Sequence, residues 1–429
     1  MKKRFAAALI GAVAALSSAA GAPGASAAEP VAGSSFSSSL PALVTHVGDT
    51  PQYRAIIPAA RPLPMPDPVR VALGRQLFLD TRLSQPQGTS CASCHDPARA
   101  FTGFNGGRDG VARGAIHSRL GTRNPPSLTY VRYLPALYFY QDDDAQVPSP
   151  FGGLMLDGRA DDVPTQMREP LLARHEMNMG NNRAVAARLQ ASGYQQAFEG
   201  LYGKDVLRDP QRAVQALGRS LEAYLQSDEL SPFSSRFDDM LRGQGTLNAQ
   251  EMRGLAVFRN PDQGNCASCH VVSVTSGNPA RSLFTDFGYD AIGVPRNRKL
   301  PSNADPRAYD LGLCRTAEQR HWPEAESWCG YFRTPSLRNV AARQRFMHNG
   351  VFDSLRDAVR FYATRSTSPA DWYGKGPAFD DIPAAMRGNI NTVANPFSRR
   401  AGTQPAMTEQ DIDDVVAFLD TLTDRPFRK

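Results

Sequence analysis

Apolar residues recur at the three- and four-residue spacing of an α-helix in several parts of the chain. In the first of these parts, Asp67 can cap a helix that has Pro68 at its first position. Val69, Leu73 and Leu77 then fall on one face of that helix. The pattern predicts an amphipathic helix that begins at residue 68.

The same arrangement returns in the second half of the chain. Asn248, with Glu251 three residues later, is typical of a capped helix start. This helix and the first one each lead to a cysteine pair followed directly by histidine, at 91–95 and at 266–270. The repeated order predicts the starts of two similar domains.

Two further segments carry helical periodicity. One spans residues 183–225, and the other follows Thr408, which has Asp411 as its capping partner. The alternation typical of strands is scarce throughout. We therefore expect an all-α protein with long ordered loops, which the high counts of glycine (35) and proline (33) also favour.

The polar stretch at 227–245 is the best candidate for a boundary between the two domains. A chain of this length exceeds what one hydrophobic core usually organises. Residues 28–62 are small, polar and rich in proline, and they resemble an extended lead segment. The expected divisions are a signal peptide at 1–27, the lead at 28–62, a first domain at 63–238 and a second domain at 239–429.

The first residues have the features of a secretory signal. Three basic residues at 2–4 precede an apolar stretch at 5–16, and a small-residue cleavage site ends near Ala27. The apolar stretch is too short to span a membrane, so we expect a periplasmic protein without a transmembrane segment. Subtracting the three signal cations from the net charge of +6 leaves about +3, which gives no reason to expect nucleic acid as a partner.

The strongest chemical signal is the motif Cys-x-x-Cys-His, which is present twice. Its residues are Cys91, Cys94 and His95 in the first copy and Cys266, Cys269 and His270 in the second. Two thiols at this spacing can add to the two vinyl groups of one haem, and the adjacent histidine then reaches the iron. A thioredoxin-like pair would need only the cysteines, and a zinc site would need further ligands. We expect two covalently bound haem c groups.

Two cysteines remain outside these motifs. In an oxidising compartment, Cys314 and Cys329 are expected to form a disulfide that closes a short loop. The alternative is that both are free thiols.

Four other runs occur in order along the chain. They are LGRQLF at 73–78, RNPPSL at 123–128, DGRA at 157–160 and RTPSLRN at 333–339. Together they resemble the bacterial dihaem cytochrome c peroxidases and the related MauG-type enzymes, from about Asp67 to the C-terminal helix. The resemblance implies two cytochrome c-like domains, each wrapped around one haem, with the peroxide-binding haem in the first and the electron-transfer haem in the second.

The resemblance also implies two residues of the peroxide pocket. Gln166 and Glu176 occupy the positions at which the family has a glutamine and a glutamate over the first haem. Cleavage of a peroxide bond needs a base that takes a proton and an acid that returns it to the departing oxygen, and one carboxylate can do both. The alternative is that Glu176 is an ordinary surface acid.

The sixth ligand of the second haem separates the subfamilies. Tyr362 falls where the peroxidases have a methionine and the MauG-type proteins a tyrosine. A phenolate stabilises ferric iron more than a thioether does, which would lower the potential of that haem. The alternatives are that Tyr362 is a core aromatic or that Met347 is the ligand.

His117 and Arg338 can each be interpreted in two ways. His117 lies near the place where peroxidases of the family carry a histidine that blocks the first haem until reduction, but it is one residue out of register. It is either such a gating ligand or a loop histidine. Arg338 can pair with a haem propionate through its planar guanidinium, or it is a plain surface arginine.

A calcium ion bridges the two domains in the family. The matching positions are Asn124 and the backbone carbonyls of Arg343 and Arg345. Oxygen ligands suit calcium, whereas the guanidinium groups of the two arginines would repel the ion or replace it. The resemblance leaves both outcomes open.

The chain departs from the family at two tryptophans. Leu156 stands where the family has a tryptophan between the haems, and Gly264 and Asn265 stand where MauG-type enzymes have another before the second cysteine pair. Leucine cannot carry an electron hole. The departures weaken the case for oxidation of a docked protein by the MauG-type route.

The sequence therefore predicts a periplasmic dihaem peroxidase. It would reduce hydrogen peroxide at the first haem with electrons relayed through the second, supplied by a small cytochrome c or a cupredoxin. One alternative is a MauG-type enzyme that oxidises residues of a partner protein. Another is a dihaem electron carrier without peroxide chemistry, against which Gln166 and Glu176 argue.

Overall fold

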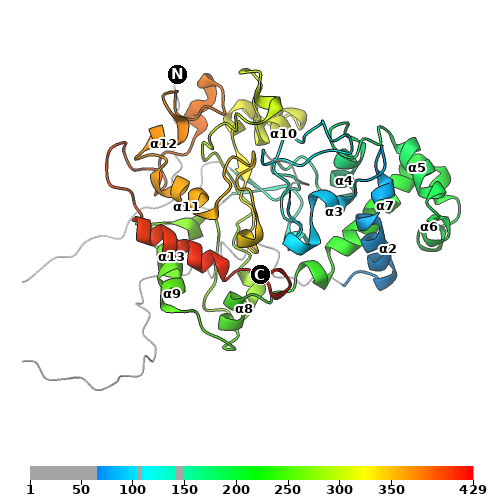
Figure 1. The fold of residues 1–429 in the computed structure, drawn as a ribbon, viewed down its shortest axis with the longest axis horizontal. Coiled ribbons are helices and arrows are strands. Elements are labelled where there is room, and N and C mark those ends of the chain that lie inside the picture. Colours follow the sequence, from blue (N-terminus) through cyan, green and yellow to red (C-terminus); the bar gives the residue numbers. More distant parts are fainter. Residues whose placement is uncertain (1–64, 104–108, 142–147, 429) are drawn as a thin grey trace, which may run out of the picture.

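The computed structural model describes residues 65–103, 109–141 and 148–428. The expected signal peptide (1–27) and lead segment (28–62) lie outside these described residues. The described chain is mostly helical, with long connections between the helices (Figure 1). Within it, no helix is long and apolar enough to cross a membrane.

The regular elements are short, and two pairs of strands accompany the helices. The helices are α2 (Pro68–Leu79), α3 (Cys91–Cys94), α4 (Val163–Leu172), α5 (Asn182–Ala191), α6 (Gln195–Tyr202), α7 (Pro210–Leu225), α8 (Arg236–Leu241), α9 (Ala249–Arg259), α10 (Leu313–Gln319), α11 (Leu355–Thr364), α12 (Pro369–Tyr373) and α13 (Glu409–Asp420). The strands are β1 (Tyr138–Tyr140), β2 (Ser149–Phe151), β3 (Tyr289–Asp290) and β4 (Phe332–Arg333).

The first group of helices forms around α2 and α7. The side chain of Asp67 accepts a hydrogen bond from the N–H of Val69, so α2 begins at Pro68 as predicted. Leu73 and Leu77 are buried, but Val69, in the first turn of α2, is 65% exposed. Helices α4 and α5 pack on α7 and complete this core.

The second group of helices forms around α9 and α13. Asn248 and Glu251 make the predicted capping box at the start of α9, and Thr408 and Asp411 make another at the start of α13. Helix α11 packs against α13 on the side away from α9 (Figure 1). This core and the first one lie at opposite ends of the molecule in the same view.

A glycine sets the closest approach of the helices in each group. A β-carbon at Gly74 of α2 would fall 1.9 Å from the carbonyl oxygen of Ser220 in α7. A β-carbon at Gly254 of α9 would fall 1.9 Å from the carbonyl oxygen of Asp414 in α13. Only a hydrogen fits at either position. In both halves a glycine therefore allows two helices to pack closely. This agrees with the order of helix and cysteine motif that is repeated in the sequence.

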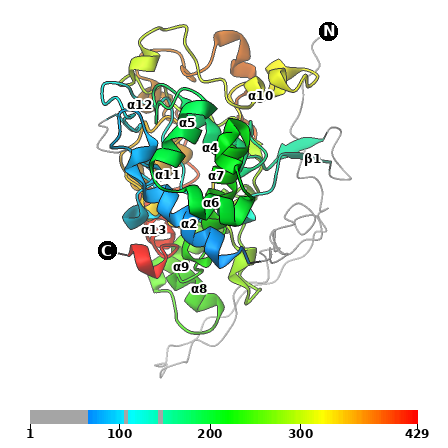
Figure 2. The same cartoon turned by 90° about the vertical axis from the view of Figure 1, so that its right-hand side faces the viewer.

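The two sheets are small antiparallel pairs. β1 pairs with β2, and β3 pairs with β4. The β1–β2 hairpin projects from one side of the molecule (Figure 2). These four strands are additions to the expected all-α fold.

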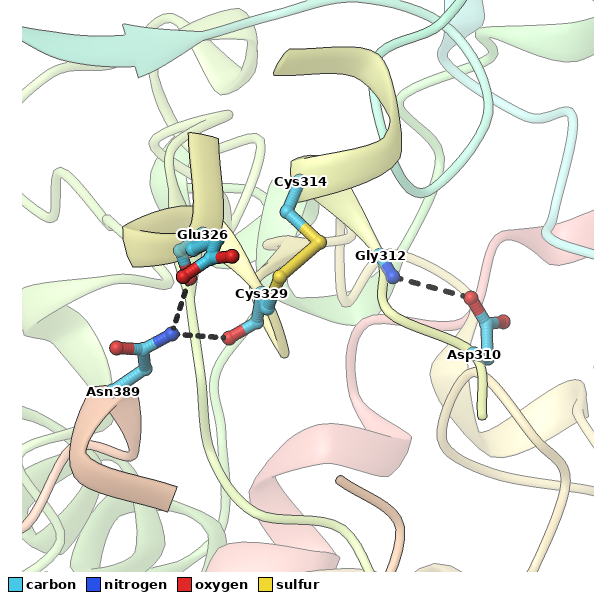
Figure 3. The surroundings of a disulfide bond; sticks show 6 residues. All are labelled: Asp310, Gly312, Cys314, Glu326, Cys329 and Asn389. Atoms are coloured by element: carbon cyan, nitrogen blue, oxygen red, sulfur yellow. Dashed lines mark hydrogen bonds between the residues drawn. A yellow bond between two sulfur atoms is a disulfide. The ribbon is translucent and has the colours of Figure 1, made fainter. Parts of the chain in front are cut away.

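A disulfide bond lies within the long connection between β3 and β4. Cys314 at the start of α10 is bonded to Cys329, as the sequence predicted (Figure 3). The side-chain amide of Asn389 donates to the carbonyl oxygens of Glu326 and Cys329, so the loop is also held from the C-terminal part of the chain.

The two helical groups meet in a polar junction. The carboxylate of Asp424 accepts hydrogen bonds from Tyr130 at 2.7 Å and from Asn339 at 2.9 Å. Phe237 of α8 packs in the second core, while Phe427 near the end of the chain packs on the first. The expected division after residue 238 falls inside α8, and the packing of Phe237 assigns that helix to the second group.

Candidate functional site

The first Cys-x-x-Cys-His motif opens a short helix, α3. Ser90 and Ser93 form a capping box around its first turn. Cys91 and Cys94 are free thiols, and burial raises the pKa of Cys91 to about 11 and that of Cys94 to about 12. The two cysteines are not joined to each other, so both sulfur atoms are available for addition to the vinyl groups of a haem.

His95 follows α3 and is oriented by two backbone carbonyls. Its Nδ1 lies 3.1 Å from the oxygen of Pro126 and 3.3 Å from that of Phe101, so Nδ1 carries the proton and donates. Burial lowers the pKa of His95 to about 4, which keeps the ring neutral. The Nε2 lone pair is then available to a metal, the usual arrangement of a histidine ligand.

The second motif repeats this geometry. Cys266 and Cys269 are free thiols in a short 3-10 turn (Cys266–Ser268) and the residue after it. His270 Nδ1 donates to the carbonyl oxygen of Phe284 at 2.9 Å, and burial lowers its pKa to about 4. Phe284 has a positive φ of 55°, as Phe101 has in the first half.

Two of the sequence runs hold in place the backbone segments that orient these histidines. Ser127, in the RNPPSL run, donates to the carbonyl oxygen of Ala100 at 2.8 Å. Ser336, in the RTPSLRN run, donates to the carbonyl oxygen of Leu283 at 2.6 Å. Each serine thus fixes the residue before the phenylalanine that accepts from the histidine ring.

Two buried arginines fit the carboxylates of a haem. Arg365 donates to the carbonyl oxygens of Ile292 and Asn391, while its Nε is buried without a partner. Arg333 lies buried at β4, and its guanidinium makes long contacts of 3.4 Å to the carbonyl oxygens of Met155 and Thr334. Burial lowers the pKa of both side chains. Neither forms an ion pair with a carboxylate in the described part of the chain, so each has charge left for an anionic ligand.

Arg338, the arginine expected to meet a propionate, has other partners. Its guanidinium forms a two-point ion pair with Asp238, at 3.0 and 3.1 Å, and both side chains are fully buried. It also donates to the carbonyl oxygens of Ser282 and Pro279. The structure therefore gives Arg338 an internal role at the junction, because its donors are engaged within the chain.

Gln166 and Glu176 come from α4 and the loop after it. Gln166 donates from Nε2 to the sulfur of Met155 at 3.5 Å. Two backbone hydrogen bonds hold Glu176. Its N–H donates to the carbonyl oxygen of Ala173, and its carbonyl oxygen accepts from the N–H of Ala115 at 2.7 Å. The position of Glu176 is therefore fixed by the chain on both sides.

The carboxyl group of Glu176 is suited to acid–base chemistry. Its pKa is raised to about 7, chiefly by burial and then by the nearby charge of Glu169, against the opposing effect of Arg159. The charge of Glu176 in turn contributes to the raised pKa of Cys94, after burial. Glu176 therefore lies close to the first Cys-x-x-Cys-His motif, with a pKa near neutrality.

A chain of ion pairs that includes Glu169 and Arg159, the two charges that act on Glu176, was not predicted from the sequence. Glu169 binds Arg159 at 2.8 and 2.9 Å, and Arg159 binds Asp157 at 2.6 and 2.7 Å. Asp157 also lies 2.8 Å from Arg123, which forms a two-point pair with Asp310 at 2.6 Å. Three of these residues belong to the DGRA and RNPPSL runs. The sequence therefore marked these residues, but it did not indicate which of them would form ion pairs.

Tyr362 lies on α11 in the second core. Its ring stacks on Phe397, with 5.6 Å between the ring centres. Burial raises the pKa of Tyr362, and the neighbouring thiols of Cys269 and Cys266 contribute to the rise, whereas Arg365 lowers it. The structure thus brings Tyr362 close to the second cysteine pair and to Arg365.

His117 is not brought to the first site. It is exposed at a turn that the N–H of Arg119 closes on the carbonyl oxygen of Ile116. In this conformation His117 is an exposed loop histidine, which agrees with the second of its two interpretations, and a gating role stays a prediction.

The expected calcium position is occupied by protein donors. Asn124 donates from its side-chain amide to the carbonyl oxygens of Arg345 at 3.0 Å and Met347 at 3.2 Å. The guanidinium of Arg343 donates to the same Arg345 oxygen at 3.2 Å. Across the described ranges, no group of three or more His, Cys, Asp or Glu side chains could hold a metal ion. These residues do not fit a divalent cation.

Comparisons with known proteins agree with this geometry. A family model described as di-haem cytochrome c peroxidase matches residues 68–246. The chain is 38% identical over 369 residues to the methylamine utilization protein MauG of Paracoccus denitrificans, which covers 84% of this chain and 90% of that protein. It is 27% identical to the cytochrome c551 peroxidase of Pseudomonas aeruginosa, over 72% of this chain and 74% of that protein.

A solved structure is also similar. The crystal structure of the diheme peroxidase BthA from Burkholderia thailandensis superposes with a TM-score of 0.84 at 53% identity, covering 86% of this chain and 90% of that chain.

Proposed function

The chain belongs to the family of di-haem cytochrome c peroxidases and MauG-type proteins, which implies haem cofactors, and from this we propose that it is an exported peroxidase. Cys91, Cys94 and His95 would hold the haem at which hydrogen peroxide is reduced. The second Cys-x-x-Cys-His motif, with its histidine at 270, would hold the haem that relays electrons. The overall reaction consumes one peroxide, two electrons and two protons and yields two waters.

Haem iron, when bound, supplies the redox chemistry that cleaves the peroxide bond. Glu176 would take the proton from the peroxide oxygen nearer the iron and return it to the departing oxygen. Gln166 would orient the peroxide with its side-chain amide. A group that both accepts and gives a proton works best with a pKa near the working pH.

The observation that carries this proposal is the state of Glu176. Its carboxyl group is largely buried, has a pKa of about 7 and lies close to Cys94. An ordinary surface glutamate would keep its usual pKa. An electron carrier without peroxide chemistry has no use for a titrating acid at this position.

The electrons would come from a small soluble donor, a cytochrome c or a cupredoxin. Leu156 occupies the position at which the family has a tryptophan between the haems, and its backbone oxygen accepts the N–H of Arg333 at 2.8 Å. This aliphatic side chain cannot be oxidised, so the transfer between haems would be direct tunnelling. No nucleic acid enters the proposal.

A second candidate is a MauG-type enzyme that oxidises residues of a partner protein. Tyr362 favours it, because a phenolate ligand lowers the potential of a haem and stabilises its oxidised forms. The 38% identity to the protein named MauG favours it as well. The absence of tryptophan at residues 156, 264 and 265 argues against the same exit route.

The test is steady-state turnover of peroxide with a reduced cytochrome c as donor. Glu176→Gln should lower the rate by roughly 10²- to 10⁴-fold, the usual contribution of a general acid–base. The matched control is Glu199→Gln on α6, where the carboxylate accepts from the exposed side chain of Gln195 at 2.9 Å. If Glu176→Gln and the control turn over alike, the acid–base assignment is wrong. If the wild type oxidises the cytochrome no faster than free peroxide does, the peroxidase assignment is wrong.

A further inference from the structure

Arg343 occupies the junction between the two halves of the molecule. It follows a short 3-10 turn (Val340–Ala342) of the second half. Its guanidinium donates from Nη2 to the carbonyl oxygen of Pro125, in the first half, at 3.1 Å. It donates from Nε to the carbonyl oxygen of Arg345, in its own half, at 3.2 Å. One positively charged group therefore ties together backbone oxygens from two segments that are 218 residues apart.

The residue beside Pro125 completes the same junction. The backbone N–H of Asn124 donates to the carbonyl oxygen of His348 at 2.7 Å. Its side-chain amide donates to the carbonyl oxygens of Arg345 and Met347. The Arg345 oxygen thus accepts two N–H groups, one from each half, and has no lone pair left for a metal.

The charge of Arg343 is not balanced by an acid of the chain. No carboxylate in the described ranges forms an ion pair with it, and burial alone lowers its pKa to about 10. The neighbouring Arg345 differs, because its side chain lies 3.7 Å from the carboxylate of Asp353, which is 66% exposed. Pro125, which accepts from Arg343, directly precedes Pro126, whose carbonyl oxygen accepts from His95 Nδ1 at 3.1 Å. Arg343 therefore lies beside the loop that orients the first histidine.

A divalent cation at this place would need a different set of groups. Calcium binds six to eight oxygen atoms at 2.3–2.6 Å, with carboxylates among them in most sites. Here the available carbonyls already accept from Asn124 and Arg343, and the nearest charge is positive. Adding a second cation beside the half-buried guanidinium of Arg343 is unfavourable, because the two positive charges repel each other.

We propose that the guanidinium of Arg343 takes the place of the interdomain calcium ion, so that the two halves are joined by a cation built into the chain. The junction then holds without a metal. Replacement of Arg343 by a neutral residue opens a site of backbone and amide oxygens between Asn124 and Arg345 into which calcium can enter.

The experiment is metal analysis of the purified protein with both haems attached. After dialysis against calcium chloride and gel filtration, the wild type should contain no stoichiometric calcium, and EGTA should leave its thermal unfolding midpoint unchanged. Arg343→Gln should unfold at a lower temperature, and calcium chloride should raise its midpoint. Its affinity for calcium should exceed that of the wild type by at least roughly tenfold.

The matched control is Arg345→Gln, which removes a neighbouring charge and leaves the carbonyl oxygen and Arg343 in place. This variant should behave like the wild type. One calcium ion per wild-type chain, with a fall of the midpoint in EGTA, would overturn the proposal even if Arg343→Gln fails to fold. None of these readouts uses peroxide turnover, so failure of the proposed enzymatic function leaves the result interpretable.

Discussion

Replacement of Glu176 by glutamine should make the protein more stable at alkaline pH while it removes the proposed acid–base. The folded protein holds this carboxyl group at a pKa of about 7, against an ordinary value of 4.5, chiefly because it is buried. A raised carboxyl pKa means that folding disfavours the ionised form. The stabilising contribution is therefore present at low pH and is lost as the pH rises through about 7.

The magnitude follows from the two pKa values. Ionised Glu176 should cost at most about 3 kcal/mol at pH 9, and less than about 1 kcal/mol at pH 5, where the folded form is still protonated. Glutamine has the same shape and no charge. For a domain of this size, about 3 kcal/mol corresponds to a rise of roughly 6–12 °C in the unfolding midpoint of the variant at pH 9.

The assay is thermal unfolding at pH 5, 7 and 9, followed by circular dichroism. Glu169→Gln serves as a control of opposite sign. Burial tends to raise the pKa of Glu169, but its hydrogen bonds and ion pair with Arg159 outweigh this and lower the pKa. Its stabilising contribution is present at high pH and is lost on acidification, so Glu169→Gln should lower the midpoint at pH 9. An equal midpoint of Glu176→Gln and wild type at pH 9 would show that Glu176 is a solvated acid.

Three further changes test other parts of the account. Tyr362→Phe removes the proposed ligand of the second haem, so it should change the ferric EPR spectrum and raise the potential of that haem. An unchanged spectrum would make Tyr362 a core aromatic. Asp238→Ala should cost about 3–5 kcal/mol in urea unfolding, because Arg338 is left buried without its counter-charge; a loss below about 1 kcal/mol would contradict this. Gly254→Ala should destabilise by at least about 1–3 kcal/mol, because its β-carbon would meet a carbonyl of α13, whereas Gly388→Ala, with open space around it, should be nearly neutral.

Local signals in the sequence were sufficient for the elements that depend on near neighbours. The caps at Asp67, Asn248 and Thr408 were predicted correctly, because a cap involves residues only two or three positions apart. The two cysteine motifs also carry their chemistry within five residues. The disulfide between Cys314 and Cys329 followed from the number of cysteines left over.

Contacts between distant segments could not be predicted in the same way. The pair between Arg123 and Asp310 joins residues 187 positions apart, and nothing local distinguishes either from a surface charge. The periodicity of α2 placed Val69 on the apolar face, but the sequence does not show how much of that face is buried. The engagement of Arg338 with Asp238, 100 residues away, was hidden for the same reason.

The most direct test of the central claim is rapid mixing of the diferric protein with one equivalent of hydrogen peroxide, followed by optical and EPR spectra. We predict that peroxide changes the spectrum of the haem on His95 first and that of the haem on His270 afterwards. Glu176→Gln should slow the first change by roughly 10²-fold or more. Two haems that ignore peroxide in the diferric protein, and again after one electron equivalent has been added, would contradict the account and leave an electron carrier.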